Sequence, residues 1–312
     1  MDRGTIRTDW ITVNGVPTRV KTWGGWIEDD LEVDSLILFI PATPGVTDFY
    51  DKFLETLYLN LRIPVWVIGH AGLQLPSPYR HLDLPSIKHN PHLYDLNGQI
   101  EHKKQFINRY IKKMKCLNLI GHSIGAKICI ELMKNDDIAN KTKQIHLLFP
   151  AIHQLANTPK GWMFTRIWSK LAPLVIFMTH LFICLPYYIR YTIIRIIIIL
   201  RTYILSIEPC YIHAILELTK PQCTRCAFFL GQSSMMSVRD LDDDVMTRHH
   251  AMIRAYFSPS DKWVPKSHYE YLRKQYPYVK TQLLEPNYKH DFLLNTSVPI
   301  ANKISNEIKS FT

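Results

Sequence analysis

A tight turn constrains this chain more than any other feature: Gly-His-Ser-Ile-Gly, centred on Ser123, joins an apolar segment to a helical one without a loop. The segment before it, "CLNLIG" at 116–121, has the composition of a strand buried on both faces, and residues 124–134 have helical spacing. A Gly-x-Ser-x-Gly turn in this context is typical of a strained elbow that exposes the serine hydroxyl above a sheet. We therefore predict that Ser123 is a nucleophile and that Gly121 and Gly125 allow close backbone approach. An ordinary structural turn is the alternative.

Apolar runs alternate with helical segments along most of the chain. Residues 8–23 alternate apolar and polar side chains around an Asn-Gly pair, which predicts a hairpin. Strands are expected at 36–41, 64–70, 116–121, 143–150, 250–259 and 278–285, and helices at 47–61, 95–113, 124–134, 265–275 and 299–311. This order predicts the α/β class, with a mostly parallel sheet and helices on both faces.

Residues 151–225 interrupt the alternation. We interpret residues 1–150 and 226–312 as the α/β core, and 151–225 as an apolar helical insertion that forms a cap or associates with a membrane. The apolar run "CAFFLGQ" at 226–232 is expected to be the strand at which the sheet resumes.

A serine hydroxyl is a weak nucleophile, so it requires a base, and the base requires an orienting acid. In α/β folds of this kind the acid and the base follow the serine along the chain, each after a late strand. Asp261 follows one such strand and His290 follows the last one, so we predict a triad of Ser123, Asp261 and His290. Capping of the helix at 265 is the alternative role for Asp261.

Two backbone amides are expected to bind the oxyanion of such a reaction. One is the Ile124 amide, at the positive end of the helix that follows the serine. The other should come from the loop "IPATPGVTDFY", where Pro44 has no N–H and Thr43 is the best candidate. His122 is expected to be a packing residue, and Asp291 a capping or surface group. This chemistry requires no metal and no organic cofactor.

The net charge of +10 is concentrated in one part of the chain. Between Asp137 and Glu208 there is no acidic residue, but there are eight basic ones: Lys141, Lys143, Lys160, Arg166, Lys170, Arg190, Arg195 and Arg201. The last three are surrounded by Ile, Leu and Tyr, which argues against nucleic acid as a partner. A cationic, apolar segment instead suits the cytosolic face of an anionic lipid surface.

Cysteine usage and the first residues bear on the compartment. Six scattered cysteines form no disulfide framework, which favours a reducing compartment. Cys223 and Cys226 lack the second pair that a zinc site would need, so inert thiols are expected and no metal. Residues 1–10 lack the apolar core of a signal peptide, so the sequons at Asn140 and Asn295 are expected to be unused.

The most apolar stretch runs from Leu171 to Leu205 and is divided by Pro186. A transmembrane helix needs about 20 apolar residues. The part before Pro186 is shorter and the part after it contains Arg190 and Arg195, so a clean single span is not expected. Two short helices folded back at Pro186 could instead enter one leaflet or a droplet monolayer. A soluble lid over an apolar cleft is the alternative, and the two can coexist.

The motifs "IPATPGVTDFYDKF", "GHSIG", "SPSDKWVP" and "KHDF", with the long apolar insertion, resemble the lipid droplet-associated hydrolase family, a branch of the α/β-hydrolases. The resemblance covers nearly the whole chain. The family's first loop usually reads Pro-Gly-Asn-Pro-Gly, and here Ala42 and Thr43 replace its Gly and Asn. The resemblance implies an α/β-hydrolase fold, and it carries the family's nucleophile, acid and base onto Ser123, Asp261 and His290.

The same resemblance implies a serine esterase that hydrolyses neutral lipids such as sterol esters and has a role in lipid storage. It implies residence on lipid droplets and on the cytosolic face of the endoplasmic reticulum, with the droplet monolayer or that membrane as partner. Two alternatives stay open: a droplet-binding scaffold with a vestigial site, and an acyltransferase or thioesterase that uses the same triad.

Overall fold

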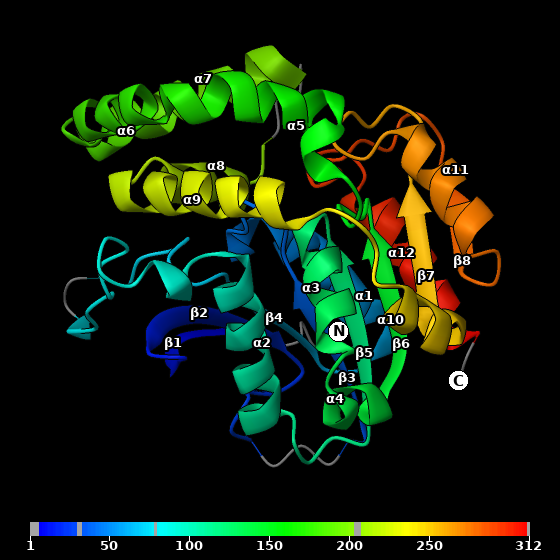
Figure 1. The fold of residues 1–312 in the computed structure, drawn as a ribbon. Helices are drawn as coiled ribbons and strands as arrows, with labels where there is room; N and C mark the ends of the chain where they lie inside the picture. The colour runs from blue at the N-terminus through cyan, green and yellow to red at the C-terminus, as the bar shows by residue number, and fades with distance from the viewer. Residues whose placement is uncertain (1–5, 30–32, 78–79, 203–206, 311–312) are drawn as a thin grey trace.

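The structure is a computed structural model that describes residues 6–29, 33–77, 80–202 and 207–310. Within these residues an eight-stranded sheet forms the centre of the molecule (Figure 1), in the order β1–β2–β4–β3–β5–β6–β7–β8. The strands are β1 (Arg7–Val13), β2 (Val16–Trp23), β3 (Ser35–Ile40), β4 (Val65–Ile68), β5 (Cys116–His122), β6 (Thr142–Leu148), β7 (Ile253–Phe257) and β8 (Lys280–Leu283). β2 pairs antiparallel with β1 and β4, and the other neighbours are parallel.

Helices cover both faces of this sheet. The 3-10 turn η1 (Thr47–Tyr50), α1 (Asp51–Leu61) and α12 (Ser297–Lys309) lie on one face, and α2 (Leu96–Tyr110), α3 (Ile124–Leu132) and α11 (Lys266–Gln275) lie on the other. The connections contain η3 (Pro91–Leu93), α4 (Asp136–Lys141), α10 (Asp243–Arg248) and η6 (His250–Met252). Along β3, Leu36, Leu38 and Ile40 pack toward the α3 face, whereas Ile37 and Phe39 pack toward the α1 face. A strand buried on both faces therefore reads as a continuous apolar run.

The hairpin of β1 and β2 has its turn at Asn14 and Gly15, whose φ angles are 50° and 72°. Two successive positive φ angles are the signature of the type I′ turn that an Asn-Gly pair favours. The hairpin, the α/β class and the mostly parallel sheet are confirmed.

The chain leaves the sheet after β6 and returns to it at β7. The intervening elements are η4 (Leu155–Asn157), α5 (Pro159–Met163), the π-helical turn η5 (Phe164–Trp168), α6 (Ser169–Ile183), α7 (Tyr187–Thr202), α8 (Pro209–Leu218) and α9 (Pro221–Ser237). They stack above the carboxyl ends of the strands, with α8 and α9 against the core and α6 and α7 outside them (Figure 1). The insertion thus lies on the side of the sheet where Ser123 is located.

The prediction of a strand at 226–232 is wrong, because these residues lie within α9. Pro221 occupies the first turn of that helix, where its missing N–H costs nothing. Cys223, Cys226 and Leu230 are buried at a spacing of three and four residues, which is helical and not the spacing of a strand. The boundary that we drew at 226 falls inside this helix, and the division into core and insertion stays an interpretation.

The apolar stretch forms two helices separated at Pro186, as expected. However, α5, η5 and α6 together make one helix of 25 residues, Pro159–Ile183, that is long and apolar enough to cross a membrane by length and composition. The expectation that this part is too short is wrong, because it counted from Leu171 and the helix begins earlier. The predicted end of the stretch, Leu205, lies outside the described residues.

Candidate active site

Ser123 lies between the last residue of β5 and the first residue of α3. Its φ of 54° and ψ of −115° are strained for a residue with a side chain. Two hydrogen bonds hold it there: its amide donates to the Leu148 carbonyl at 2.9 Å, and its carbonyl accepts from the Ala151 amide at 3.1 Å. The end of β6 and the loop that follows therefore support the strained turn.

The glycines on either side of Ser123 are required by close backbone contacts. A Cβ on Gly121 would lie 2.5 Å from the Gly125 carbonyl oxygen. A Cβ on Gly125 would lie 2.2 Å from the Ile40 carbonyl oxygen. Any side chain at either position would force α3 away from the sheet and would displace the serine.

The structure brings Ser123, Asp261 and His290 together. His290 Nε2 lies 2.9 Å from Ser123 Oγ, and His290 Nδ1 lies 2.7 Å from Asp261 Oδ2. Because the carboxylate oxygen accepts, the ring proton is on Nδ1 and the lone pair of Nε2 faces the serine hydroxyl. This is the tautomer that a general base needs in order to take the serine proton.

Asp261 occupies the turn after β7, and its side chain is fully buried. Its Oδ1 accepts hydrogen bonds from the Trp263 amide at 2.7 Å and the Val264 amide at 3.1 Å. Helix α11 begins after Pro265 without a side-chain cap, so the alternative role of Asp261 as its cap is not observed. Asp291 is exposed beside the triad.

His290 lies in a long irregular loop between β8 and α12, so side chains must hold that loop in place. The Tyr211 hydroxyl, from α8, donates to the Leu293 carbonyl at 2.7 Å. The His122 ring nitrogen Nε2 lies 3.0 Å from the carbonyl oxygen of His290 itself. The loop of the candidate base is therefore tied both to the insertion and to the residue before Ser123.

The two predicted oxyanion donors, Thr43 and Ile124, line the same pocket as Ser123. Among the described residues, neither of their amide hydrogens has a protein acceptor, which leaves both available to a ligand. The Ala42 amide donates to the Tyr50 hydroxyl at 3.0 Å and is not available.

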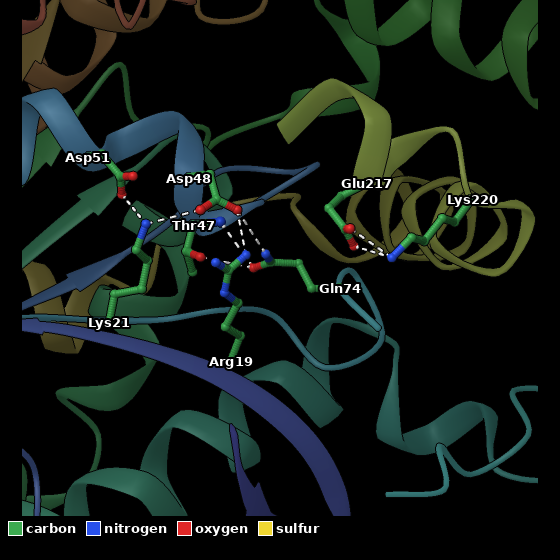
Figure 2. A network of polar contacts seen from close by, with 8 residues as sticks. All are labelled: Arg19, Lys21, Thr47, Asp48, Asp51, Gln74, Glu217 and Lys220. Atoms are coloured by element: carbon green, nitrogen blue, oxygen red, sulfur yellow. Dashed lines mark hydrogen bonds and ion pairs between the residues drawn. The ribbon is translucent and has the colours of Figure 1, made fainter. Parts of the chain in front are cut away.

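An ionic cluster anchors the far end of the loop that contains Thr43 (Figure 2). Asp48, in η1, accepts from Arg19 Nη1 at 2.5 Å and from Lys21 Nζ at 3.0 Å, both on β2. The amide and the hydroxyl of Thr47 donate to Gln74 Oε1, each at 3.1 Å. Tyr50 holds the start of the loop and these side chains hold its end. The Thr43 amide between them is therefore kept in place.

A cavity of about 270 Å³ opens beside Ser123. We call residues 41–46, between β3 and η1, the oxyanion loop after their predicted role. The cavity walls are mostly apolar and come from this loop, α3, η4, η5, α9 and the turn after β7: Thr43, Pro44, Ile124, Leu155, Phe164, Ala227, Phe228, Gly231, Ser234, Met235 and Trp263. The Phe164 and Phe228 rings stack with centroids 6.0 Å apart, which joins η5 to α9. We did not predict the α9 residues as part of the site. Their helical spacing is the sequence signal that could have identified them.

Within the described part of the chain, no group of three or more His, Cys, Asp or Glu residues could hold a metal ion. Cys223 and Cys226 lie in α9, where burial raises the pKa of each thiol to about 12.

Residues 33–293 match the family model described as "Lipid-droplet associated hydrolase". The chain belongs to this family. The lipid droplet-associated hydrolase of Drosophila melanogaster is 33% identical over 294 residues, which are 94% of each chain. That of Homo sapiens is 30% identical over 317 residues, which cover 97% of this chain and 95% of the relative.

Solved structures show that this member of the lipid-droplet associated hydrolase family has the α/β-hydrolase fold. A thermophilic esterase from Thermogutta terrifontis superposes with a TM-score of 0.62 at 11% identity, covering 98% of this chain and 99% of that one. The haloalkane dehalogenase DbeA from Bradyrhizobium elkani gives 0.63 at 9% identity, with 98% and 99% covered. At such identities the likeness concerns the fold alone, because this fold supports many chemistries.

Proposed function

We propose that this chain is a serine hydrolase that cleaves ester bonds of neutral lipids at a lipid surface. One observation carries the proposal: the hydroxyl of Ser123 lies 2.9 Å from His290 Nε2, at the mouth of an apolar cavity. The names of the relatives from Drosophila melanogaster and Homo sapiens support a hydrolase that acts at lipid droplets.

In the proposed first step, Ser123 Oγ attacks the ester carbonyl and His290 Nε2 takes its proton. Asp261 holds the ring and stabilises the imidazolium. The oxyanion that forms accepts hydrogen bonds from the Ile124 and Thr43 amides. When the intermediate collapses, His290 protonates the departing alcohol and the acyl group stays on Ser123.

In the second step, water attacks the acyl carbonyl and gives a proton to His290. Collapse of this intermediate returns the proton to Ser123 Oγ and releases the fatty acid. Since the cavity walls are mostly apolar, the acyl chain is the part of the substrate that the cavity suits. The alcohol would remain toward the lipid.

We further propose that α6 and α7 attach the protein to that lipid. Large apolar side chains are exposed along both helices: Leu171, Leu174, Phe177, Met178, Leu181, Ile183, Tyr187, Tyr188, Ile196, Ile197 and Leu200. A patch of this size on a soluble surface marks an interaction site. Arg166, Lys170, Arg195 and Arg201 are exposed beside it and would pair with anionic head groups.

Sterol esters are the substrate class that we propose, with lipid storage as the process. Lipid droplets and the cytosolic face of the endoplasmic reticulum are the proposed locations. The support is the family membership, together with a basic, apolar outer surface next to the site.

The catalytic proposal is tested by labelling with a fluorophosphonate probe and by a panel of sterol esters, triacylglycerols and acyl-CoA. We expect Ser123 to be labelled, and Ser123→Ala to abolish both labelling and fatty-acid release, because no other group supplies the nucleophile. Product analysis separates hydrolysis from acyl transfer. A folded wild-type protein whose Ser123 resists the probe would contradict the enzyme proposal and favour a scaffold.

The attachment proposal is tested by flotation with artificial droplets that have a phospholipid monolayer. We expect Phe177→Glu combined with Leu181→Glu to weaken binding at least about tenfold, because two charges would enter the apolar phase. The control is Leu59→Glu, which changes an exposed apolar residue on α1, a helix that belongs to the face of the sheet and not to the insertion. Equal binding of the double variant and the control would refute attachment through α6.

A further inference from the structure

A chain of hydrogen bonds links three separate segments of the site. The Ala42 amide, in the oxyanion loop, donates to Tyr50 Oη at 3.0 Å. Tyr50 Oη lies 2.9 Å from His122 Nδ1. His122 Nε2 lies 3.0 Å from the His290 carbonyl oxygen. The chain thus runs from the oxyanion loop, through the residue before Ser123, to the backbone of the candidate base.

Only one arrangement of protons satisfies every member of this chain. A backbone carbonyl can only accept, so His122 Nε2 must carry a hydrogen. In a neutral ring Nδ1 then accepts, and its donor must be the Tyr50 hydroxyl. The oxygen of Tyr50 in turn accepts from the Ala42 amide, which can only donate. A cationic His122 would leave the Tyr50 hydroxyl without an acceptor.

The surroundings of His122 favour this neutral ring. The side chains of His122 and Tyr50 are almost fully buried, and the rings of Phe149 and Phe292 stand edge-on to the imidazole. Burial, reinforced by the neighbouring His290, holds the pKa of His122 well below its usual value. Burial also raises the pKa of Tyr50, so its hydroxyl keeps the proton that it donates.

We propose that Tyr50 and His122 are positioning residues for the triad, which set the distance between the nucleophile, the base and the oxyanion donors. The inference rests on the proposed function and adds two residues to it. His122 cannot serve as a second base, because both of its ring nitrogens are engaged away from Ser123.

Two consequences follow for the reacting groups. Because Tyr50 occupies the Ala42 amide, the next amide along the loop, that of Thr43, is left to face the oxyanion. Because no helix or strand contains His290, the bond from His122 fixes its backbone directly beside the serine. Both contacts matter most in the transition state, when the proton moves and the oxyanion forms.

The test uses the full-length protein with a short soluble ester, p-nitrophenyl butyrate, and four variants: Tyr50→Phe, His122→Phe, the double variant and His122→Gln. We expect kcat to fall about ten- to a hundredfold in the two Phe variants at nearly unchanged KM, because positioning acts on the transition state. The kcat of the double variant should be no lower than that of the more impaired single variant, because each substitution interrupts the same series of hydrogen bonds. His122→Gln keeps a donor toward His290 and should recover part of kcat. If His122→Phe fails to fold, His122→Gln takes its place in the comparison with Tyr50→Phe.

The matched control is Tyr256→Phe. Tyr256 Oη lies 3.0 Å from His146 Nδ1, so this is a second buried Tyr–His pair, located between β6 and β7. We expect this variant to lose stability while kcat changes by less than about twofold. Equal effects of Tyr50→Phe and Tyr256→Phe on kcat, or additive losses in the double variant, would overturn the positioning role.

A nitrogen-15 NMR spectrum of the histidine side chains tests this series of hydrogen bonds independently of turnover. We expect His122 in the Nε2–H tautomer, with a shift of its Nδ1 resonance in Tyr50→Phe. A cationic ring or the Nδ1–H tautomer would overturn the inference even in an active enzyme. If the expected tautomer is found but the wild type resists both the fluorophosphonate and the ester, the proposed function fails, and the positioning role fails with it.

Discussion

The two carboxylate oxygens of Asp261 have separate partners. Oδ2 accepts from His290 Nδ1, and Oδ1 accepts from the Trp263 and Val264 amides. The backbone amides therefore fix the carboxylate in the turn, and the carboxylate fixes the tautomer of His290. The two partners allow the proposed orienting role of Asp261 to be separated from its structural role.

We predict that Asp261→Asn lowers kcat by roughly 10⁴-fold, because a neutral amide neither enforces the tautomer nor stabilises the imidazolium. The oxygen of Asn can still accept from the two amides, so the urea midpoint should change little. Asp261→Ala should lose activity to a similar degree and should also lose about 1–3 kcal/mol of stability, because it leaves both amides unpaired. Esterase assays and urea unfolding of both variants measure the difference. An active Asp261→Asn protein would show that another residue orients His290.

The order of elements along the chain was enough to predict Ser123, Asp261 and His290 as a candidate triad. Each follows a strand of a parallel sheet, and the carboxyl ends of such strands meet at one edge. The partner of His122 could not be predicted in this way. Tyr50 is 72 residues away and lies in a helical turn, and nothing in the local pattern pairs it with a particular histidine.

Helix α9 has two faces with different surroundings. Cys226 and Leu230 pack into the core, while Ala227, Phe228 and Gly231 line the cavity beside Ser123. At Gly231 the Phe164 ring of η5 comes close enough that a Cβ would lie 2.7 Å from it. The size of the residue at 231 therefore controls both the depth of the cavity and the contact between α9 and η5.

We predict that Gly231→Val shortens the cavity and shifts the preference toward short acyl chains. Activity on p-nitrophenyl palmitate should fall about tenfold or more relative to the acetate, because the new side chain occupies the space of several methylenes. The neighbouring Gln232→Val is the control, since Gln232 is exposed on the same helix. An unchanged palmitate-to-acetate ratio in Gly231→Val would mean that the acyl chain binds elsewhere.

Several histidines are buried and have no carboxylate partner among the residues that the structure describes. Burial lowers the pKa of His70, His102 and His122 well below the usual value, with further contributions from nearby Lys103 or His290. It lowers the pKa of His146 to about 3. The unfolded chain, with histidine pKa values near 6.5, therefore binds more protons than the native protein in mild acid.

We predict that the free energy of unfolding decreases as the pH falls from about 6.5 to 5, because the unfolded chain takes up a proton at each of these histidines and the native protein does not. Asp51 acts in the opposite direction, because burial raises its pKa to about 6, above its unfolded value. Its protonation in the native protein therefore adds about 1 kcal/mol to the free energy of unfolding over the same pH range. The net effect is a loss of stability in acid. Urea unfolding at pH 7.5, 6 and 5 measures it.

The pH slope has an internal control. Replacement of the exposed His89 by Asn should leave the slope unchanged, whereas His146→Gln should reduce it, because one proton uptake on unfolding is removed. A stability that is constant or higher at pH 5 would contradict the prediction.

The sequence by itself determined the α/β sheet and the three residues at its edge. Apolar periodicity, the Asn-Gly hairpin and the Gly-His-Ser-Ile-Gly turn are local patterns, and the geometry of parallel strands converts their order into proximity. Only the tertiary structure decided that residues 226–232 belong to a helix, because an apolar run of seven residues suits a strand and a helix equally well. It also decided the partners of His122 and the wall of the cavity, because these contacts join segments that are far apart in the chain and meet only when the core packs.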